Sequence, residues 1–124
     1  MGMTTSGGTG MQYMLLICAN SAEGPIDAEP ELDIDQWVEE MDGRGIRSMG
    51  ERLAPPADAT TVRVRNGKVL LTDGPFVETK EIICGFDLIE CRDLDEAIEV
   101  ARKHPMATYG MVEVRPFWTP PPPS

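Results

Sequence analysis

The feature that most constrains this chain is the order in which strand-like and helix-like segments alternate along it. Residues 13–18, YMLLIC, form an apolar run too short for a separate helix, which is typical of a strand near the centre of a sheet, covered on both faces. A helix pattern over residues 33–41 follows, then two or three strand patterns, a second helix pattern over 93–103 and a last alternating strand at 111–115. This order already restricts the chain to few folds.

Both helix patterns begin with a capping signal. Asp33 precedes the first and Asp93 the second, and Gln36 and Glu96 stand three residues later, where each completes a capping box. Each helix is therefore expected to turn one apolar face to a core. These faces consist of Ile34, Trp37, Val38 and Met41 in the first helix and of Leu94, Ala97, Ile98 and Ala101 in the second.

The middle of the chain contains a strong hairpin signal. Residues 61–65, TVRVR, alternate apolar and polar side chains, and Asn66 and Gly67 suit a two-residue turn before the return strand KVLLT. A third strand of this group is expected over residues 82–91, where Gly85 is placed for a bulge or a close backbone approach. The sequence therefore predicts a β-hairpin followed by a longer strand.

This order of elements is that of a ferredoxin-like fold, a split pair of βαβ units. It predicts one α+β domain with an antiparallel sheet and both helices on one face. The opposite face would still carry apolar side chains, drawn from residues 62–64, 69–71 and 112–114. Because one layer of helices cannot cover both sides, we expect two copies to pair through the bare face as a homodimer.

Length and composition fit a single domain. The 124 residues are 41% hydrophobic and 26% charged, which is enough to bury a core without metal or disulfide staples. We expect the domain over residues 11–118, with a disordered extension or cloning remnant at 1–10 and a disordered proline tail at 119–124. The formal charge of −10 argues against a nucleic-acid partner, and the lack of a long apolar run argues against a membrane.

The three cysteines, Cys18, Cys84 and Cys91, lie inside or beside apolar stretches, and none belongs to a C-x-x-C pair. An odd number does not suit a secreted disulfide framework. We expect buried thiols in a reducing cytosol, and therefore a cytoplasmic protein. The alternative, a catalytic thiolate, needs a basic neighbour that is not obvious in the sequence.

Several segments together resemble one protein family. They are GERLAPP at 50–56, TTVRVRNGKVLLTDGPFVETKE at 60–81, GFDLIE at 85–90, DLDEAIE at 93–99 and VEVRP at 112–116. They resemble the YCII-related family, and the tetrad at 73–76, DGPF, resembles its DGPF subgroup. The likeness spans about residues 11–117 and implies a dimeric α+β barrel built from two ferredoxin-like protomers.

The resemblance implies less about activity, because the family is largely uncharacterised. Its broader membership resembles an enzyme group whose proposed centre pairs a histidine of the first helix with an aspartate in a cleft. This chain has no histidine in its first helix pattern, and its sole histidine, His104, follows the second, where a capping or solvated role is expected. The His–Asp chemistry therefore does not transfer. Related DGPF proteins resemble companions of extracytoplasmic-function sigma factors, which implies such a regulatory partner.

The candidate site is the loop that follows the hairpin. Asp73 either accepts amide hydrogen bonds within its own turn or acts as a base or anchor at the mouth of a cleft. In the second interpretation Lys80 holds an anion and Phe76 walls the pocket. Arg52 either clamps a carboxylate or pairs with an acid. The ligand-binding candidates are Arg52, Phe76, Glu78, Lys80 and Glu81, and the catalytic candidate is Asp73.

Functions from different classes fit these residues. The first is a binding or accessory domain, a homodimer whose cleft holds a small molecule. The second is a cofactor-free enzyme that abstracts a proton from a small carbonyl compound or isomerises it, with Asp73 as base and Arg52 or Lys80 steadying the anion. A third is a pure assembly module. Metal-ligand spacings and nucleotide-binding glycine motifs are missing from the sequence, so we expect no metal and no cofactor.

Overall fold

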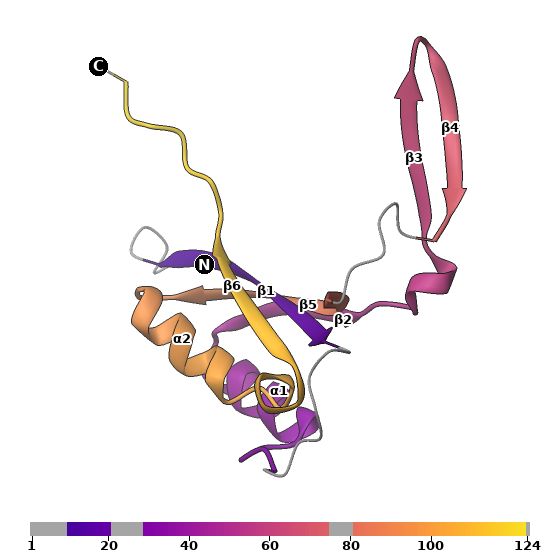
Figure 1. Cartoon of the computed structure of the whole chain (residues 1–124). Helices are drawn as coiled ribbons and strands as arrows, with labels where there is room; N and C mark the ends of the chain where they lie inside the picture. Colours follow the sequence, from indigo (N-terminus) through magenta and orange to yellow (C-terminus); the bar gives the residue numbers. More distant parts are fainter. Residues whose placement is uncertain (1–9, 21–28, 75–80, 124) are drawn as a thin grey trace.

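The chain forms a four-stranded antiparallel sheet with helices along one side (Figure 1). The computed structural model describes residues 10–20, 29–74 and 81–123. The strands of this main sheet are β1 (Met11–Asn20), β2 (Arg47–Arg52), β5 (Glu81–Cys91) and β6 (Met111–Pro116). They lie in the order β2-β5-β1-β6, with each neighbouring pair antiparallel.

The two longer helices join strands that are not neighbours in the sheet. Helix α1 (Ile34–Gly43) lies between β1 and β2 in the chain, and α2 (Leu94–Arg102) lies between β5 and β6. A short helix, α3 (Met106–Tyr109), leads into β6. This arrangement is the predicted ferredoxin-like α+β fold, with β1 at a central position of the sheet as its apolar run indicated.

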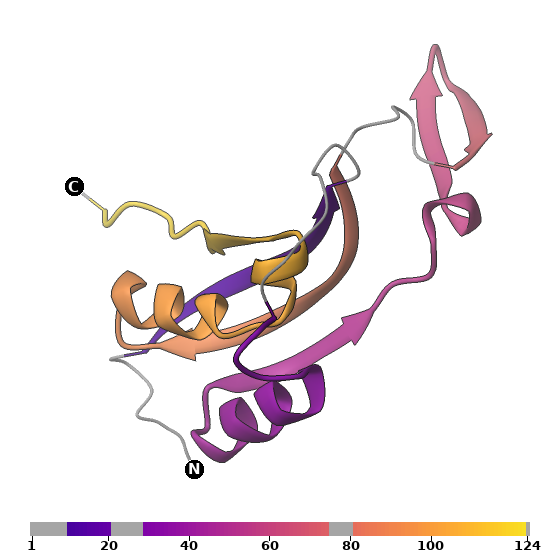
Figure 2. The ribbon, with the colours of Figure 1, turned by 60° about the horizontal axis from the view of Figure 1, so that its bottom comes forward.

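The second strand of the main sheet is β2, and not a strand of the predicted hairpin. Its residues, RSMGER, are mostly exposed at an edge of the sheet, so they lack the apolar alternation that marks a strand in a sequence. The predicted hairpin is present as β3 (Thr60–Arg65) and β4 (Lys68–Asp73), but it forms a separate two-stranded sheet. It follows the short helix η2 (Pro56–Asp58) and stands clear of the main sheet and its helices (Figure 2).

The structure confirms the local roles predicted for two glycines. Asn66 and Gly67 have φ values of 54° and 76°, as a hairpin turn with both central residues at positive φ requires. The register between β1 and β5 shifts beside Gly85, where a Cβ atom would lie 2.8 Å from the carbonyl oxygen of Glu51. Gly85 therefore permits both a bulge and the close approach of β2.

The helix caps are local features that largely follow the prediction. The side chain of Asp33 accepts a hydrogen bond from the Gln36 N–H at 2.8 Å, and the Gln36 side chain accepts one from the Asp33 N–H at 2.9 Å. Asp93 likewise accepts the N–H of Glu96, but the Glu96 carboxylate returns to the N–H of Arg92 instead of Asp93. The second capping box is therefore displaced by one residue.

The core lies between the main sheet and the helices. Trp37 of α1 is fully buried, and its Nε1–H donates to the carbonyl oxygen of Val100 in α2 at 2.9 Å, which ties the helices together. The inward face of α2 is narrower than predicted, since Leu94 and Ile98 are about half exposed. The buried core consists of Tyr13, Leu15, Ile17, Trp37, Met41, Ile46, Ile89, Cys91, Ala97, Val100 and Ala101.

The side of the main sheet away from α1 and α2, called the open face below, is apolar at its centre. Side chains alternate along a strand, so Met14 and Leu16 point away from the helices while their neighbours in β1 are buried beneath them. Leu88 lies opposite Met14 and Phe86 opposite Leu16 in β5, and Met49 of β2 lies opposite Leu88. These five residues form one continuous apolar patch, which in a single chain is only partly covered.

The composition of the open face corrects the sequence-based expectation. Residues 62–64 and 69–71 lie in the separate hairpin and contribute nothing to the main sheet. Val112 and Val114 of β6 pack against the core on the helix side. The expectation of a bare apolar face holds, but β1, β2 and β5 supply it, because the missed strand β2 displaces the hairpin from the sheet.

Candidate functional site

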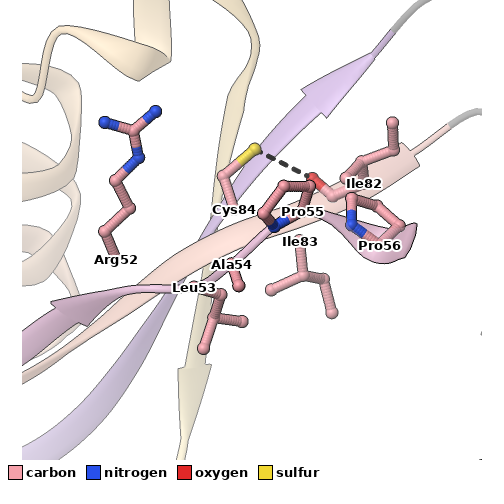
Figure 3. A pocket seen from close by; sticks show the side chains of 8 residues that line it. All are labelled: Arg52, Leu53, Ala54, Pro55, Pro56, Ile82, Ile83 and Cys84. Atoms are coloured by element: carbon pink, nitrogen blue, oxygen red, sulfur yellow. Dashed lines mark hydrogen bonds between the residues drawn. The ribbon is translucent and has the colours of Figure 1, made fainter. Parts of the chain in front are cut away.

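A groove of about 550 Å³ lies where the end of β2 and the following Leu53–Pro56 stretch pass the beginning of β5 (Figure 3). This is the neck from which the hairpin departs. Its volume falls within the range of small-molecule sites, about 300–1,000 Å³. The residues that line it are Arg52, Leu53, Ala54, Pro55, Pro56, Ile82, Ile83 and Cys84.

The walls of the groove are apolar except for one guanidinium group. Leu53 and Ile83 point to one side of the strand pair, while Arg52 and Cys84 point to the other (Figure 3). The N–H of Leu53 donates to the carbonyl oxygen of Cys84 at 2.8 Å, which continues the β2–β5 ladder to the rim. Within the described part of the chain, the exposed Arg52 side chain has no ion-pair partner. A bound anion would therefore meet an uncommitted cation.

Of the predicted site residues, the described ranges contain only Arg52, Asp73 and Glu81. Arg52 lines the groove, as a ligand-binding role requires. Asp73 ends β4, opposite Thr60, with an exposed side chain, and among the described residues no ion pair joins it to Arg52. Its assignment as a base or anchor stays a prediction. Glu81 begins β5.

The remaining predicted residues, Phe76, Glu78 and Lys80, lie outside the described residues. Pro75, which follows Asp73 and Gly74 in the chain, also lies outside the described residues. Sequence reasoning also missed the apolar wall of the groove. Ile82 and Ile83 were expected only as strand residues, and no local pattern indicates that the diproline at 55–56 passes in front of them.

A buried ion pair beneath the helices is a second polar feature that the sequence did not reveal. Asp87 of β5 is 6% exposed, and its Oδ1 accepts a hydrogen bond from Nε of Arg47 at 2.8 Å. Burial raises the pKa of Asp87, while the Arg47 guanidinium opposes that rise. A Cβ at Gly50 would collide with the Asp87 carboxylate, so this glycine makes room for the pair. The pair fastens β2 to β5.

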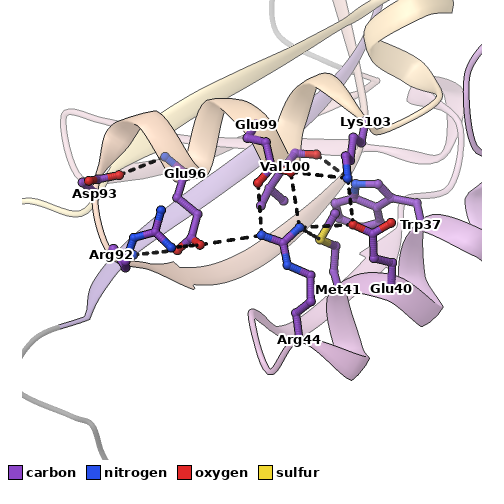
Figure 4. Close-up of polar contacts among 10 residues, drawn as sticks. All are labelled: Trp37, Glu40, Met41, Arg44, Arg92, Asp93, Glu96, Glu99, Val100 and Lys103. Atoms are coloured by element: carbon purple, nitrogen blue, oxygen red, sulfur yellow. Dashed lines mark hydrogen bonds and ion pairs between the residues drawn. The ribbon is translucent and has the colours of Figure 1, made fainter.

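A cluster of charged side chains joins the outer surfaces of α1 and α2 (Figure 4). Arg44 contacts Glu40 at 3.1 Å and Glu99 at 3.0 Å, and Lys103 contacts the same two carboxylates at 3.0 and 3.3 Å. The Glu99–Lys103 contact is an i,i+4 pair at the end of α2. The bonds to Lys103 and Arg44 lower the pKa of Glu40 and Glu99. With all charges satisfied mutually, this cluster is structural.

His104 is buried beside the first helix, which contradicts the solvated role considered for it. It is 3% exposed, its ring meets Trp37 edge-on with centroids 4.6 Å apart, and Nδ1 accepts the N–H of Met106 at 3.0 Å. Burial lowers the pKa of His104 to about 4. The ring is therefore neutral near pH 7 and supports the start of α3.

No disulfide bond joins any two of Cys18, Cys84 and Cys91. Cys18 and Cys91 are buried as predicted, and burial together with the charge of Glu96 raises the pKa of Cys91 to about 11. Cys84 is partly exposed in the groove, where its Sγ–H donates to the carbonyl oxygen of Ile82 at 3.5 Å. The expectation of buried thiols thus holds for two of the three.

The described residues form neither a metal-binding cluster nor a membrane-spanning helix. No set of three or more His, Cys, Asp or Glu side chains in the described ranges is arranged to hold a metal ion. None of the helices in these ranges has the length and hydrophobicity that a transmembrane span needs.

The sheet order, the crossover helices and the inserted hairpin define a ferredoxin-like α+β domain with a groove at the hairpin's neck. Comparison with protein families matches residues 11–119 to the YCII-related domain. The chain therefore belongs to the YCII-related family.

A curated relative carries no further information about activity. The chain is 48% identical over 68 residues to a Rhizobium meliloti (strain 1021) protein named "Uncharacterized protein R00369". The match covers 53% of this chain and 55% of that protein, so the chain spans about half the length of this relative.

Proposed function

We propose that this chain is a homodimeric, small-molecule-binding accessory domain of the DGPF subgroup. Two copies pack through their open faces, and the neck groove holds a ligand with an apolar body and an acidic group. The observation that carries the proposal is the apolar patch of Met14, Leu16, Met49, Phe86 and Leu88.

The open face favours a second copy for physical reasons. Apolar area left in water costs about 25 cal/mol per Å², and a sheet face with a continuous apolar centre is a poor solvent surface. A two-fold pair covers the same patch on both copies at once, since each supplies the surface that the other needs. The helix side of the sheet is already filled by the core.

Met49 offers a direct test of the dimer. It is 47% exposed at the β2 edge of the open face, so Met49→Glu places a charge in the interface without disturbing the core. We expect this change to weaken dimerisation by about tenfold or more. Sedimentation equilibrium of the full chain measures the dissociation constant. Ser48→Glu is the matched control, because Ser48 is the exposed neighbour in the same strand and lies outside the patch.

The outcomes of this test are distinct. A dimeric wild type, a monomeric M49E and a dimeric S48E support pairing through the open face. A wild type that stays monomeric at micromolar concentration overturns the homodimer. Equal dissociation constants for the two variants overturn the open face as the interface.

The chemistry of the groove supports the ligand class. Leucine, isoleucine and proline walls suit an apolar body, and Arg52 at the rim suits a carboxylate or a similar anion. Decanoate is a suitable probe, with decanol as its uncharged counterpart. We expect Arg52→Gln to weaken decanoate binding by roughly fivefold and to leave decanol binding unchanged, as measured by isothermal titration calorimetry.

Arg65→Gln is the control for this experiment, since Arg65 lies at the distant hairpin turn and is also exposed. Equal binding of decanoate by the wild type and R52Q would refute the anion-binding role of Arg52. If neither probe binds the wild type at millimolar concentration, the groove is not a site for this ligand class.

The finer parts of the proposal rest on charge and resemblance. The tetrad DGPF at 73–76 supports the subgroup, and three cysteines without a disulfide among them suit a cytoplasmic location. A formal charge of −10 suits the masking of a basic surface, which supports an extracytoplasmic-function sigma factor as regulatory partner. Titration with a purified factor of this class from the same organism is the test, and no complex at low salt would exclude that partner.

A further inference from the structure

The β3–β4 hairpin has one face with four exposed apolar side chains at its centre and the Thr60–Asp73 pair at its base. Val62 lies opposite Leu71 and Val64 lies opposite Val69, so all four point to the same side of the hairpin. Their exposed fractions are 60%, 67%, 56% and 63%. Such exposed apolar side chains on one side of a hairpin indicate that another surface covers them.

The other side of the hairpin is different in character. Thr61 lies opposite Thr72, Arg63 opposite Leu70 and Arg65 opposite Lys68, so this side is mostly polar and basic. The hairpin is thus amphipathic, but its two strands pack chiefly against each other. An isolated two-stranded hairpin is at best marginally stable in water, and it gains stability only when its apolar face is covered. The cover must come from a surface beyond the hairpin itself.

The charge of the hairpin indicates what kind of surface this is. Residues 60–73 contain three basic side chains and one acidic one, for a formal charge of +2, whereas the rest of the chain carries −12. The basic side chains Arg63, Arg65 and Lys68 lie on the face opposite the four apolar side chains, so they do not contact a surface that covers the apolar face. Their charge still attracts a strongly acidic body across the width of the hairpin, since the Debye length is about 10 Å. A second copy of this chain supplies such an acidic surface, since its residues outside the hairpin carry a formal charge of −12.

The position of the hairpin agrees with this partner. It rises from the neck on the side of the main sheet away from α1 and α2, which is the side of the open face (Figure 1). A copy seated on the open face would therefore lie beside the hairpin. Two-fold symmetry would then give two such contacts, one from each hairpin.

We propose that the β3–β4 hairpin is a dimer clasp, which packs its apolar face of Val62, Val64, Val69 and Leu71 against the second copy. The clasp rests on the proposed homodimer and extends it, because it places much of the stabilising contact in an inserted hairpin outside the ferredoxin-like sheet. It also explains why residues so apolar occupy an arm that stands away from its own core.

The two faces of the hairpin provide a matched pair of variants. Leu71→Asp introduces a charge on the apolar face, and Thr72→Asp introduces the same charge one residue later on the opposite face. Leu71 is 67% exposed and Thr72 is exposed, so neither change affects the core. We expect L71D to raise the dimer dissociation constant by about tenfold or more and T72D by less than about threefold, as measured by sedimentation equilibrium.

Hydrogen exchange of the wild-type chain gives a second readout. The amides of residues 60–73 should exchange more slowly in the dimer at high concentration than in the monomer at high dilution. If the wild type is a monomer, the proposed homodimer itself fails. If the wild type is a dimer but L71D and T72D dissociate alike, or if the hairpin amides gain no protection, the clasp is overturned while the dimer stands.

Discussion

At the scale of single residues, His104 links the core to pH. Because burial lowers its pKa from 6.5 to about 4, the folded chain keeps it neutral at pH values where the unfolded chain protonates it. Its contribution to the free energy of unfolding is therefore complete above about pH 6.5 and is lost as the pH falls toward 4. Between pH 7 and pH 5 the wild type should lose about 2 kcal/mol more than His104→Gln, as measured by urea unfolding.

The glutamine variant is chosen because its amide oxygen still accepts the N–H of Met106. Other groups that titrate in acid, such as Glu40 and Glu99 with their lowered pKa values and Asp87 with its raised pKa, are present in both proteins and cancel in the difference. Parallel stability curves for the two proteins would show that His104 titrates normally in the folded state.

At the scale of elements, a helix cap or turn can be predicted from the sequence when residues close in the chain determine its structure. The capping box of Asp33 and Gln36 and the turn at 66–67 were predictable because their hydrogen bonds and dihedral angles depend on neighbours in the chain. Strand β2 could not be predicted in this way, because it forms by pairing with β5 and its side chains are mostly exposed. Local propensity is weak wherever tertiary pairing decides.

The candidate site follows the same division. Arg52 stood out in the sequence through its chemistry beside a diproline, and its binding role stays a prediction. The apolar wall of the groove arises instead from how β5 passes that segment. The hairpin itself was predicted correctly, but its place outside the main sheet was not, since a strand with exposed valines has the same alternation as one that packs on a core.

At the scale of the whole molecule, the open face and the hairpin together expose apolar side chains that one chain cannot cover. If two copies cover them, unfolding is coupled to dissociation, and thermal stability depends on protein concentration. A hundredfold increase in concentration should raise the melting temperature of the wild type by about 5 °C, since mass action adds about 2.7 kcal/mol per dimer. Differential scanning calorimetry at several concentrations measures the effect.

The variant M49E supplies the comparison, because below its raised dissociation constant it is a monomer, whose melting temperature should not change with concentration. L71D, which keeps the sheet contact but loses the clasp, should lose the concentration dependence in the same way below its own dissociation constant. M49E thus tests the contact through the open face, and L71D tests the contact through the hairpin. A wild-type melting temperature that does not change with concentration would mean that the exposed apolar surfaces are stable in water within one chain, and the coupling of folding to pairing would be wrong.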